Sequence, residues 1–92
     1  MESKISTEFL QTVKEAKRTS PEKEIPVIVT YEPSAAADIS SSLEDAGLKV
    51  ENRFSEINSV SGKITAKSIE KLLQVAEVKK VDPDSKMYAL GQ

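Results

Sequence analysis

Carboxylates are the groups in this sequence that could bind a metal ion or exchange a proton, because the 92 residues contain neither Cys nor His. Thiolate nucleophiles, thiolate metal sites, disulfides and histidine general bases are therefore all excluded. The acidic residues do not follow the spacing of a calcium-binding loop, and no pair of them sits in a Gly-rich segment. We therefore expect a protein that is not an enzyme and that carries no metal or cofactor.

Two short segments near the C-terminus have residue types suited to binding. Asp82-Pro83-Asp84 places two carboxylates around a proline, which predicts an end to regular structure. Met87-Tyr88-Ala89-Leu90 then gathers apolar side chains at the end of the chain, where exposed apolar groups are a liability. This tail either folds back on its own domain or is covered by a partner.

Composition narrows the choice of partner. The chain has 13 basic and 15 acidic side chains, a net charge of -2, and few aromatic residues. Phosphate binding needs a basic excess and base stacking needs aromatic platforms, so we expect no nucleic acid partner. No apolar run reaches membrane-spanning length, and no secretion signal follows Met1. We expect no membrane partner, and a cytoplasmic protein if the chain is complete as written or a secreted one if it is an excised segment.

The N-terminal part reads as a helix and a linker. Apolar residues recur at helical spacing over about residues 5–18, at Ile5, Phe9, Val13 and Ala16. The polar, Pro-containing stretch 19–24 predicts a linker. The helix either packs on its own domain or serves a partner.

From Ile25 onward the pattern predicts the order strand, helix, strand, strand, helix, strand. The predicted strands are residues 25–31, 48–54, 60–64 and 78–81. The first helix is expected to begin with Ser34 as N-cap and to end at Gly47, and the second to follow Thr65. Gly62 inside a strand predicts a close backbone approach or a bulge, and the shifted alternation after Phe54 predicts a bulge or a loose turn near Ser55-Glu56.

This order is typical of an α+β, ferredoxin-like βαββαβ domain, with a four-stranded antiparallel sheet and two helices on one face, here with an extra N-terminal helix. We expect residues 1–24 to form the N-terminal helix and linker and residues 25–92 to form the domain, with a tail over about 85–92. The face of the sheet opposite the two helices then meets water, the N-terminal helix or a partner.

An ordered set of motifs resembles the pro-regions of subtilisin-type serine proteases and their free-standing inhibitor relatives. The motifs are Phe54-x-x-Ile57, Val60-Ser61-Gly62-Lys63-Ile64-Thr65, Ile69-Glu70-Lys71-Leu72-Leu73 and the stretch from Val75 to Asp84. With the first strand and helix, the resemblance covers roughly Ile25 to Leu90 and leaves the first 24 residues outside. Residues 25–92 are thereby expected to be a propeptide-like inhibitor domain.

The resemblance implies how such a domain binds. In the family, the folded body docks its sheet face on two surface helices of the protease. Carboxylates after the last strand cap the N-termini of those helices, and Asp82 and Asp84 fall on these positions.

The family's C-terminal tail lies extended in the substrate cleft of the protease. By this resemblance Leu90 aligns with the primary specificity pocket, and Ala89, Tyr88 and Met87 align with the second, third and fourth subsites. The expected cut point lies between Leu90 and Gly91.

The sequence thus predicts an inhibitor of a subtilisin-like serine protease that is a monomer when free. One alternative is a pro-region, which acts as intramolecular chaperone and inhibitor through the same contacts. The start at Met1, the lack of a signal and the end two residues beyond the expected cut favour the stand-alone inhibitor. A further alternative is a non-catalytic regulatory module that binds another protein through a sheet edge and needs no tail.

Overall fold

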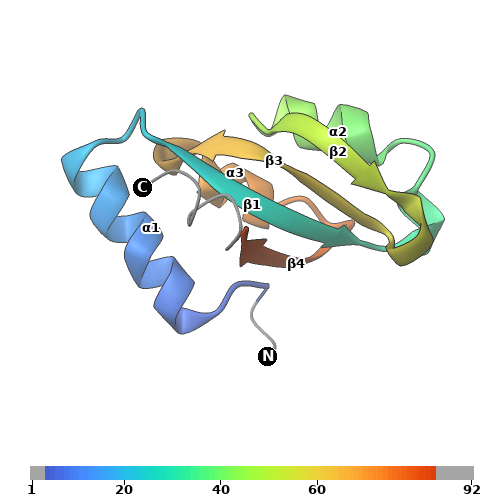
Figure 1. The fold of residues 1–92 in the computed structure, drawn as a ribbon, viewed down its shortest axis with the longest axis horizontal. Helices are drawn as coiled ribbons and strands as arrows, with labels where there is room; N and C mark the ends of the chain where they lie inside the picture. The colour runs from blue at the N-terminus through green and yellow to red at the C-terminus, as the bar shows by residue number, and fades with distance from the viewer. Residues whose placement is uncertain (1–3, 85–92) are drawn as a thin grey trace.

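Four strands form one antiparallel sheet in the computed structural model, which describes residues 4–84 (Figure 1). Strand β1 (Glu24–Tyr31) pairs with β3 (Ser59–Thr65) on one side and with β4 (Val78–Pro83) on the other, and β2 (Lys49–Phe54) pairs with β3. The resulting order, β2-β3-β1-β4, is that of the ferredoxin-like fold. The predicted fold class is confirmed.

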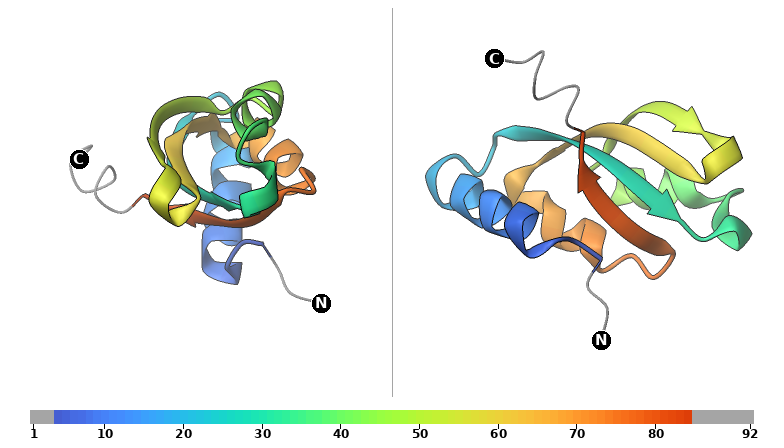
Figure 2. Two further views of the ribbon diagram at one scale, coloured as in Figure 1. Left: turned by 90° about the vertical axis from the view of Figure 1, so that its right-hand side faces the viewer. Right: turned by 60° about the horizontal axis from the view of Figure 1, so that its bottom comes forward.

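Three helices lie on one side of this sheet (Figure 2). Helices α2 (Ile39–Asp45) and α3 (Ile69–Leu73) cover the face, and α1 (Thr7–Thr19) lies beside α3, where Lys17 Nζ donates a 2.7 Å hydrogen bond to Glu70 Oε1. The N-terminal helix therefore packs on its own domain. It does not cover the opposite face of the sheet, so that alternative is wrong.

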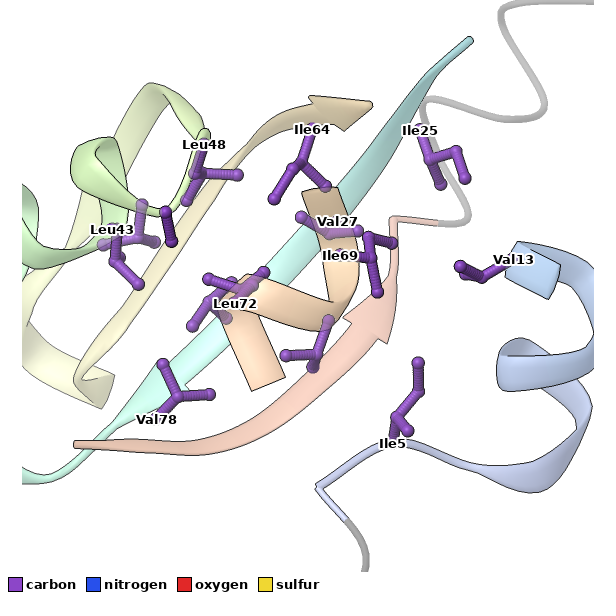
Figure 3. Close-up of a cluster of buried hydrophobic side chains, with 14 of the residues drawn as sticks. Ile5, Val13, Ile25, Val27, Leu43, Leu48, Ile64, Ile69, Leu72 and Val78 are labelled. Carbon is purple, nitrogen blue, oxygen red and sulfur yellow. The ribbon is translucent and has the colours of Figure 1, made fainter. Parts of the chain in front are cut away.

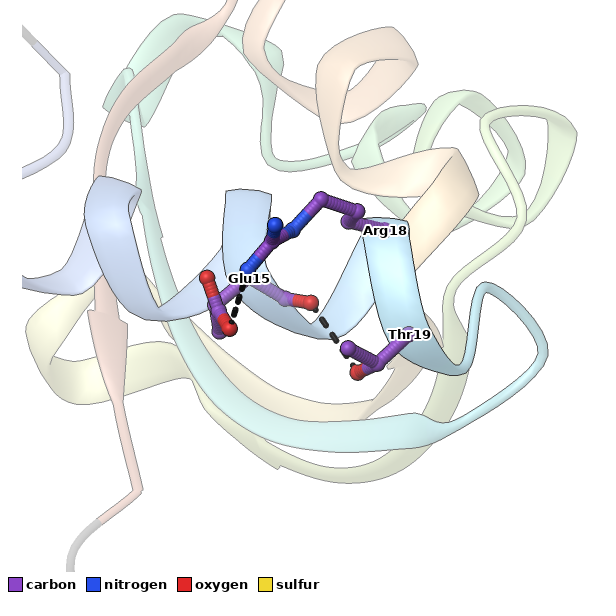
Figure 4. Close-up of polar contacts among 3 residues, drawn as sticks. All are labelled: Glu15, Arg18 and Thr19. Atoms are coloured by element: carbon purple, nitrogen blue, oxygen red, sulfur yellow. Dashed lines mark hydrogen bonds and ion pairs between the residues drawn. The ribbon is translucent and has the colours of Figure 1, made fainter.

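Helix α1 has well-formed ends. Its N-cap Ser6 accepts a 3.2 Å hydrogen bond from the Phe9 N–H, which satisfies one of the otherwise unpaired donors of the first turn. In its last turn, Arg18 Nη2 donates to Glu15 Oε1 at 2.6 Å, and Thr19 Oγ1 donates to the Glu15 carbonyl at 3.0 Å (Figure 4). These local bonds add to the burial of Phe9 and Val13, which holds the helix on the domain.

The core lies between the sheet and the helices (Figure 3). Alternate residues of β1 point into it and are buried: Ile25, Val27, Val29 and Tyr31. Ile39 and Leu43 of α2 and Ile69 and Leu72 of α3 meet them. Ile5, Phe9 and Val13 belong to the same cluster, each 5% exposed or less. The N-terminal segment thus shares one core with the sheet.

The first predicted helix begins later than expected. Residues Pro33–Ala35 form a 3₁₀ turn, η1, and the N-cap of α2 is Asp38, so the prediction of Ser34 as N-cap is wrong. Arg53 Nη2 donates a 2.9 Å hydrogen bond to the Ala36 carbonyl, which engages an oxygen that an earlier helix would have used for its own first turn. The C-terminal prediction is confirmed, because Gly47 has φ +106° directly after the helix.

The residues after Phe54 form the predicted turn and not a bulge. Ser55–Ile57 form a 3₁₀ turn, η2, which ends at Asn58 in the left-handed conformation (φ 52°) and accounts for the shifted alternation after Phe54. The register irregularity falls instead between Val50 and Asn52, opposite Gly62. A Cβ at Gly62 would lie 2.2 Å from the Lys49 carbonyl oxygen. The expected close backbone approach at Gly62 is therefore confirmed. A third short turn, η3 (Ala66–Ser68), leads into α3.

The last strand continues past its predicted end. Asp82 and Pro83 belong to β4, where Pro83 pairs with Val27 as the last residue of the strand, so the break predicted for Asp82-Pro83-Asp84 comes two residues later than the expected strand end at Val81. The Asp84 N–H donates to the Pro26 carbonyl at 3.1 Å. Because bonded pairs alternate in an antiparallel ladder, Pro83 occupies a non-bonded pair and its nitrogen faces away from β1. Proline is tolerated at such an edge position.

Candidate functional site

The face of the sheet turned away from the helices carries small, neutral side chains along its middle. Residues of β1 that point away from the core, Ile28 and Thr30, are half-buried. They pair with Ser61 and Ser59 of β3, which are 6% and 4% exposed. Neighbouring side chains therefore cover most of this central strip, Ile28, Thr30, Ser59 and Ser61, and the strip carries no charge of its own.

Two hydroxyls of the central strip, those of Thr30 and Ser59, are hydrogen-bonded within the domain. Thr30 Oγ1 and Ser59 Oγ lie 3.4 Å apart, and Ser59 Oγ donates to the Ile57 carbonyl at 3.3 Å. A partner that covers this face does not leave these two hydroxyls without hydrogen bonds, so the desolvation penalty is small. The strip is suited to burial against a flat or ridged protein surface.

Ion pairs surround the strip. Lys49 Nζ lies 2.5 Å from Glu24 Oε2, and Lys63 Nζ lies 4.0 Å from Glu51 Oε2. The hydrogen bond from Lys49, then its charge, and then the charge of Lys63 lower the pKa of Glu24 below its usual 4.5. The same contact raises the pKa of Lys49 above its usual 10.5. These charges compensate one another, so the face as a whole offers no strong field of one sign.

The two predicted carboxylates, those of Asp82 and Asp84, lie on the edge of this face that β4 forms. Asp82 pairs with Ile28, which places it on the same side of the sheet as the central strip. The bond from Asp84 N–H to Pro26 extends the register by two residues, so Asp84 occupies the same side. Two residues of strand separate their backbones by about 7 Å. The two acidic residues singled out from the sequence therefore lie on the same face of the sheet.

Asp82 is partly accessible in the free domain. Its side chain is 39% exposed, and its Oδ2 lies 3.7 Å from Lys80 Nζ, a pair on the surface. Exposed ion pairs of this length are weak, since water and salt screen them. Asp82 can therefore exchange Lys80 for a stronger partner at low cost.

Two exposed apolar side chains were not expected from the sequence. Phe54 is 44% exposed and Ile57 is 65% exposed, on either side of the polar Ser55-Glu56 pair in η2. Phe54 pairs with Ser59 and so adjoins the central strip. The sequence pattern assigned Phe54 to a half-buried strand, and only the parity of the pairing reveals that it points away from the core.

The remaining predicted site residues, Met87, Tyr88, Ala89, Leu90 and Gly91, lie outside the described residues. Within residues 4–84, no three acidic side chains gather into a group that could hold a metal ion. No helix in that range combines the length and the apolar character needed to cross a bilayer.

Comparison with models of known protein families gives a match over nearly the whole chain. The family model described as peptidase inhibitor I9 matches residues 4–90. The match begins ahead of α1, whereas the resemblance noted from the motifs began at Ile25. No curated protein matches the chain.

Proposed function

The chain belongs to the peptidase inhibitor I9 family, the family of subtilisin propeptides, and on this premise we propose that it inhibits a subtilisin-like serine protease by a two-part grip. The sheet face seats beside the active site, and the C-terminal tail enters the substrate cleft as a product-like segment. The observation that carries the proposal is the alignment of Asp82 and Asp84 with a neutral strip on the uncovered face of the sheet.

The central strip supports docking on helices of the protease. A helix presents ridges of side chains, and two neighbouring helices present a broad, corrugated surface. Ser59 and Ser61 add no charge and little exposed polar surface that a partner would have to desolvate, while Ile28 contributes apolar area. Phe54 and Ile57 extend the apolar area at one end.

The carboxylates support the same orientation. The N-terminus of a helix has unpaired N–H groups and a partial positive charge, so a carboxylate placed there is favourable by about 0.5–2 kcal/mol. Asp82 and Asp84 are spaced by about 7 Å along the strand, close to the 8–10 Å between the axes of packed helices. Each carboxylate can therefore serve one of two adjacent helices.

The tail would provide specificity. We propose that residues of about 85–92 lie in the cleft as an added strand, with Leu90 in the primary pocket and Ala89, Tyr88 and Met87 in the next three subsites. Burying a leucine or methionine side chain contributes roughly 1.5–3 kcal/mol. Residues 25–84 are the body in this division.

The two-part grip also explains inhibition in place of digestion. A cut between Leu90 and Gly91 releases only the last two residues. The new carboxylate end stays in the cleft, because the body holds it there at a high effective concentration. The chain therefore behaves as a retained product.

The test is to titrate a purified subtilisin with the chain while following hydrolysis of a peptide substrate. We expect stoichiometric inhibition by the full chain and its loss when residues 87–92 are deleted. Mass spectrometry of the mixture should show a chain shortened by Gly91-Gln92 at most. A deletion variant that binds the protease as tightly as the full chain would instead favour a regulatory module that binds through the sheet.

A further inference from the structure

The segment ahead of β1 contacts the strand that carries both docking carboxylates. Ile5 forms a parallel bridge with Val81, and the Val81 N–H donates a 2.7 Å hydrogen bond to the Lys4 carbonyl. Val81 precedes Asp82 directly. Strand β4 has β1 on only one side, so this bond engages the strand at its outer edge.

A second contact ties the same segment to the loop before β4. Lys4 Nζ donates a 2.7 Å hydrogen bond to the Val75 carbonyl. The backbone and the side chain of one residue thus reach both the middle of β4 and the loop that leads into it. Ile5 is 5% exposed beside Val81 and adds apolar contact to these polar bonds.

The far end of the segment is anchored as well. Lys67 donates its backbone N–H to the Pro21 carbonyl at 3.1 Å, and its side chain pairs with Glu22. The Ala66 N–H donates to the Lys23 carbonyl at 2.9 Å. Between these ends, Phe9 and Val13 are buried in the common core. Residues 4–24, called the N-terminal clamp below, are therefore fixed along their length.

From these contacts we infer that the N-terminal clamp is a positioning element, which holds β4 on the sheet so that Asp82 and Asp84 are aligned before a protease arrives. The inference rests on the proposed function. An edge strand held by one neighbour frays more readily than one held on both sides. Molecules with β4 displaced lose the contacts of the two carboxylates and bind more weakly, so the apparent affinity falls as their fraction rises. Lys4 and Ile5 thus act on binding through the two carboxylates.

The experiment is a double-mutant cycle on inhibition of a subtilisin. Ile5→Ala is combined with Asp82→Ala and Asp84→Ala. We expect Ile5→Ala to weaken inhibition about fivefold to tenfold in the otherwise unchanged chain, and less than about twofold when the carboxylates are already gone. A loss of equal size in both backgrounds would reduce the clamp to a purely structural part and overturn the inference.

A matched control removes the same atoms from the other side of the core. Ile39 of α2 is fully buried and does not touch the clamp's bond to β4. Ile39→Ala should have the same effect on inhibition with and without the carboxylates. If Ile5→Ala does not fold, Lys4→Met takes its place. This variant removes the bond to Val75 and keeps the aliphatic stem. We expect it to weaken inhibition about threefold, with the same dependence on the carboxylates.

Amide hydrogen exchange supplies a readout that does not need a protease. Ile5→Ala should speed exchange at Val81, whose N–H is bonded to Lys4, and leave Val60 in the central strand β3 protected. Unchanged exchange at Val81 would overturn the clamp. If the unmodified chain inhibits no subtilisin, the proposed function fails. If it inhibits and Ile5→Ala inhibits equally well, only the clamp fails.

Discussion

The N–H of Asp84 is bonded to the carbonyl of Pro26 at 3.1 Å, and Pro26 has no N–H with which to return the bond. A bonded pair in an antiparallel ladder normally exchanges two hydrogen bonds. The pair at Pro26 and Asp84 has one, so the chain is held to β1 at Asp84 less firmly than at Asp82. This asymmetry sits where the body of the proposed inhibitor gives way to its tail.

Removing the two carboxylates should weaken inhibition and leave the fold intact. We expect Asp82→Ala with Asp84→Ala to raise the inhibition constant about tenfold, since each helix-capping contact is worth about 1 kcal/mol or less in a partly exposed site. The inhibition constant against a subtilisin and the thermal midpoint provide the measurements. Asp45→Ala, which removes an exposed carboxylate from α2, is the control and should change neither. An unchanged constant for the double variant would remove the capping role.

A charge at the proposed pocket residue should abolish most of the inhibition. Leu90→Asp replaces an apolar side chain by one that must lose its hydration in the pocket, and we expect a loss of at least about a hundredfold. Gln92→Asp introduces the same charge two residues later and should change inhibition less than about threefold, because it lies beyond the expected cut. Both variants should keep the thermal midpoint of the unmodified chain. Equal inhibition by Leu90→Asp would show that another residue occupies the pocket.

A side chain at Gly62 should destabilise the sheet. The Cβ of Gly62→Ala would lie 2.2 Å from the Lys49 carbonyl oxygen, which belongs to the backbone of β2 and cannot rotate away. We expect the free energy of unfolding in urea to fall by about 1–3 kcal/mol. Lys63→Ala at the next position should change the free energy of unfolding by less than about 0.5 kcal/mol, since the ion pair of Lys63 with Glu51 is exposed and 4.0 Å long. A neutral Gly62→Ala would mean that β2 moves aside freely.

The pair of Glu24 and Lys49 should give stability a defined dependence on pH. The pKa of Glu24 is lowered in the folded state, so its contribution is full above the usual value of 4.5 and is lost as pH falls through the folded value. The pKa of Lys49 is raised, so its contribution is full below 10.5 and is lost as pH rises through the folded value. Thermal midpoints of the unmodified chain and Glu24→Gln at pH 7 and pH 3 provide the measurement.

The drop in thermal midpoint from pH 7 to pH 3 should be larger for the unmodified chain than for Glu24→Gln, which has no proton to bind at this site. Because the pair is on the surface, 1 M salt should reduce this difference between the two proteins. Identical pH profiles for the two proteins would show that the contact does not stabilise the folded state.

Much of the fold follows from periodicity, because the burial of alternate residues in β1 and of one stripe in each helix is a local property of the sequence. Where prediction failed, a distant group intervened. Arg53 is bonded to the Ala36 carbonyl just ahead of α2, and pairing with β1 extends β4 to Pro83. Neither contact leaves a trace in local composition.

The candidate site was predictable only in part. Asp82 and Asp84 stand out around a proline, and their shared face follows from strand alternation once β4 is known to continue. The buried serines of the strip, Ser59 and Ser61, could not be recognised from the sequence. Serine is common on exposed strands, and only the pairing with β1 shows which side of the sheet is left uncovered. The part played by Lys4 depends on a contact across 77 positions of sequence, from Lys4 to Val81.

The parallel pairing of Ile5 with Val81 has a consequence for the self-association of the protein. An apolar tail that inserts beside a protease strand could equally insert beside the sheet of a neighbouring molecule, and repeated insertion would build a fibre. One outer edge of the sheet is already occupied at Val81 by the chain's own Lys4. The other, β2, is interrupted between Val50 and Asn52 and lined by charged side chains. Self-association along the sheet is thereby discouraged at both edges.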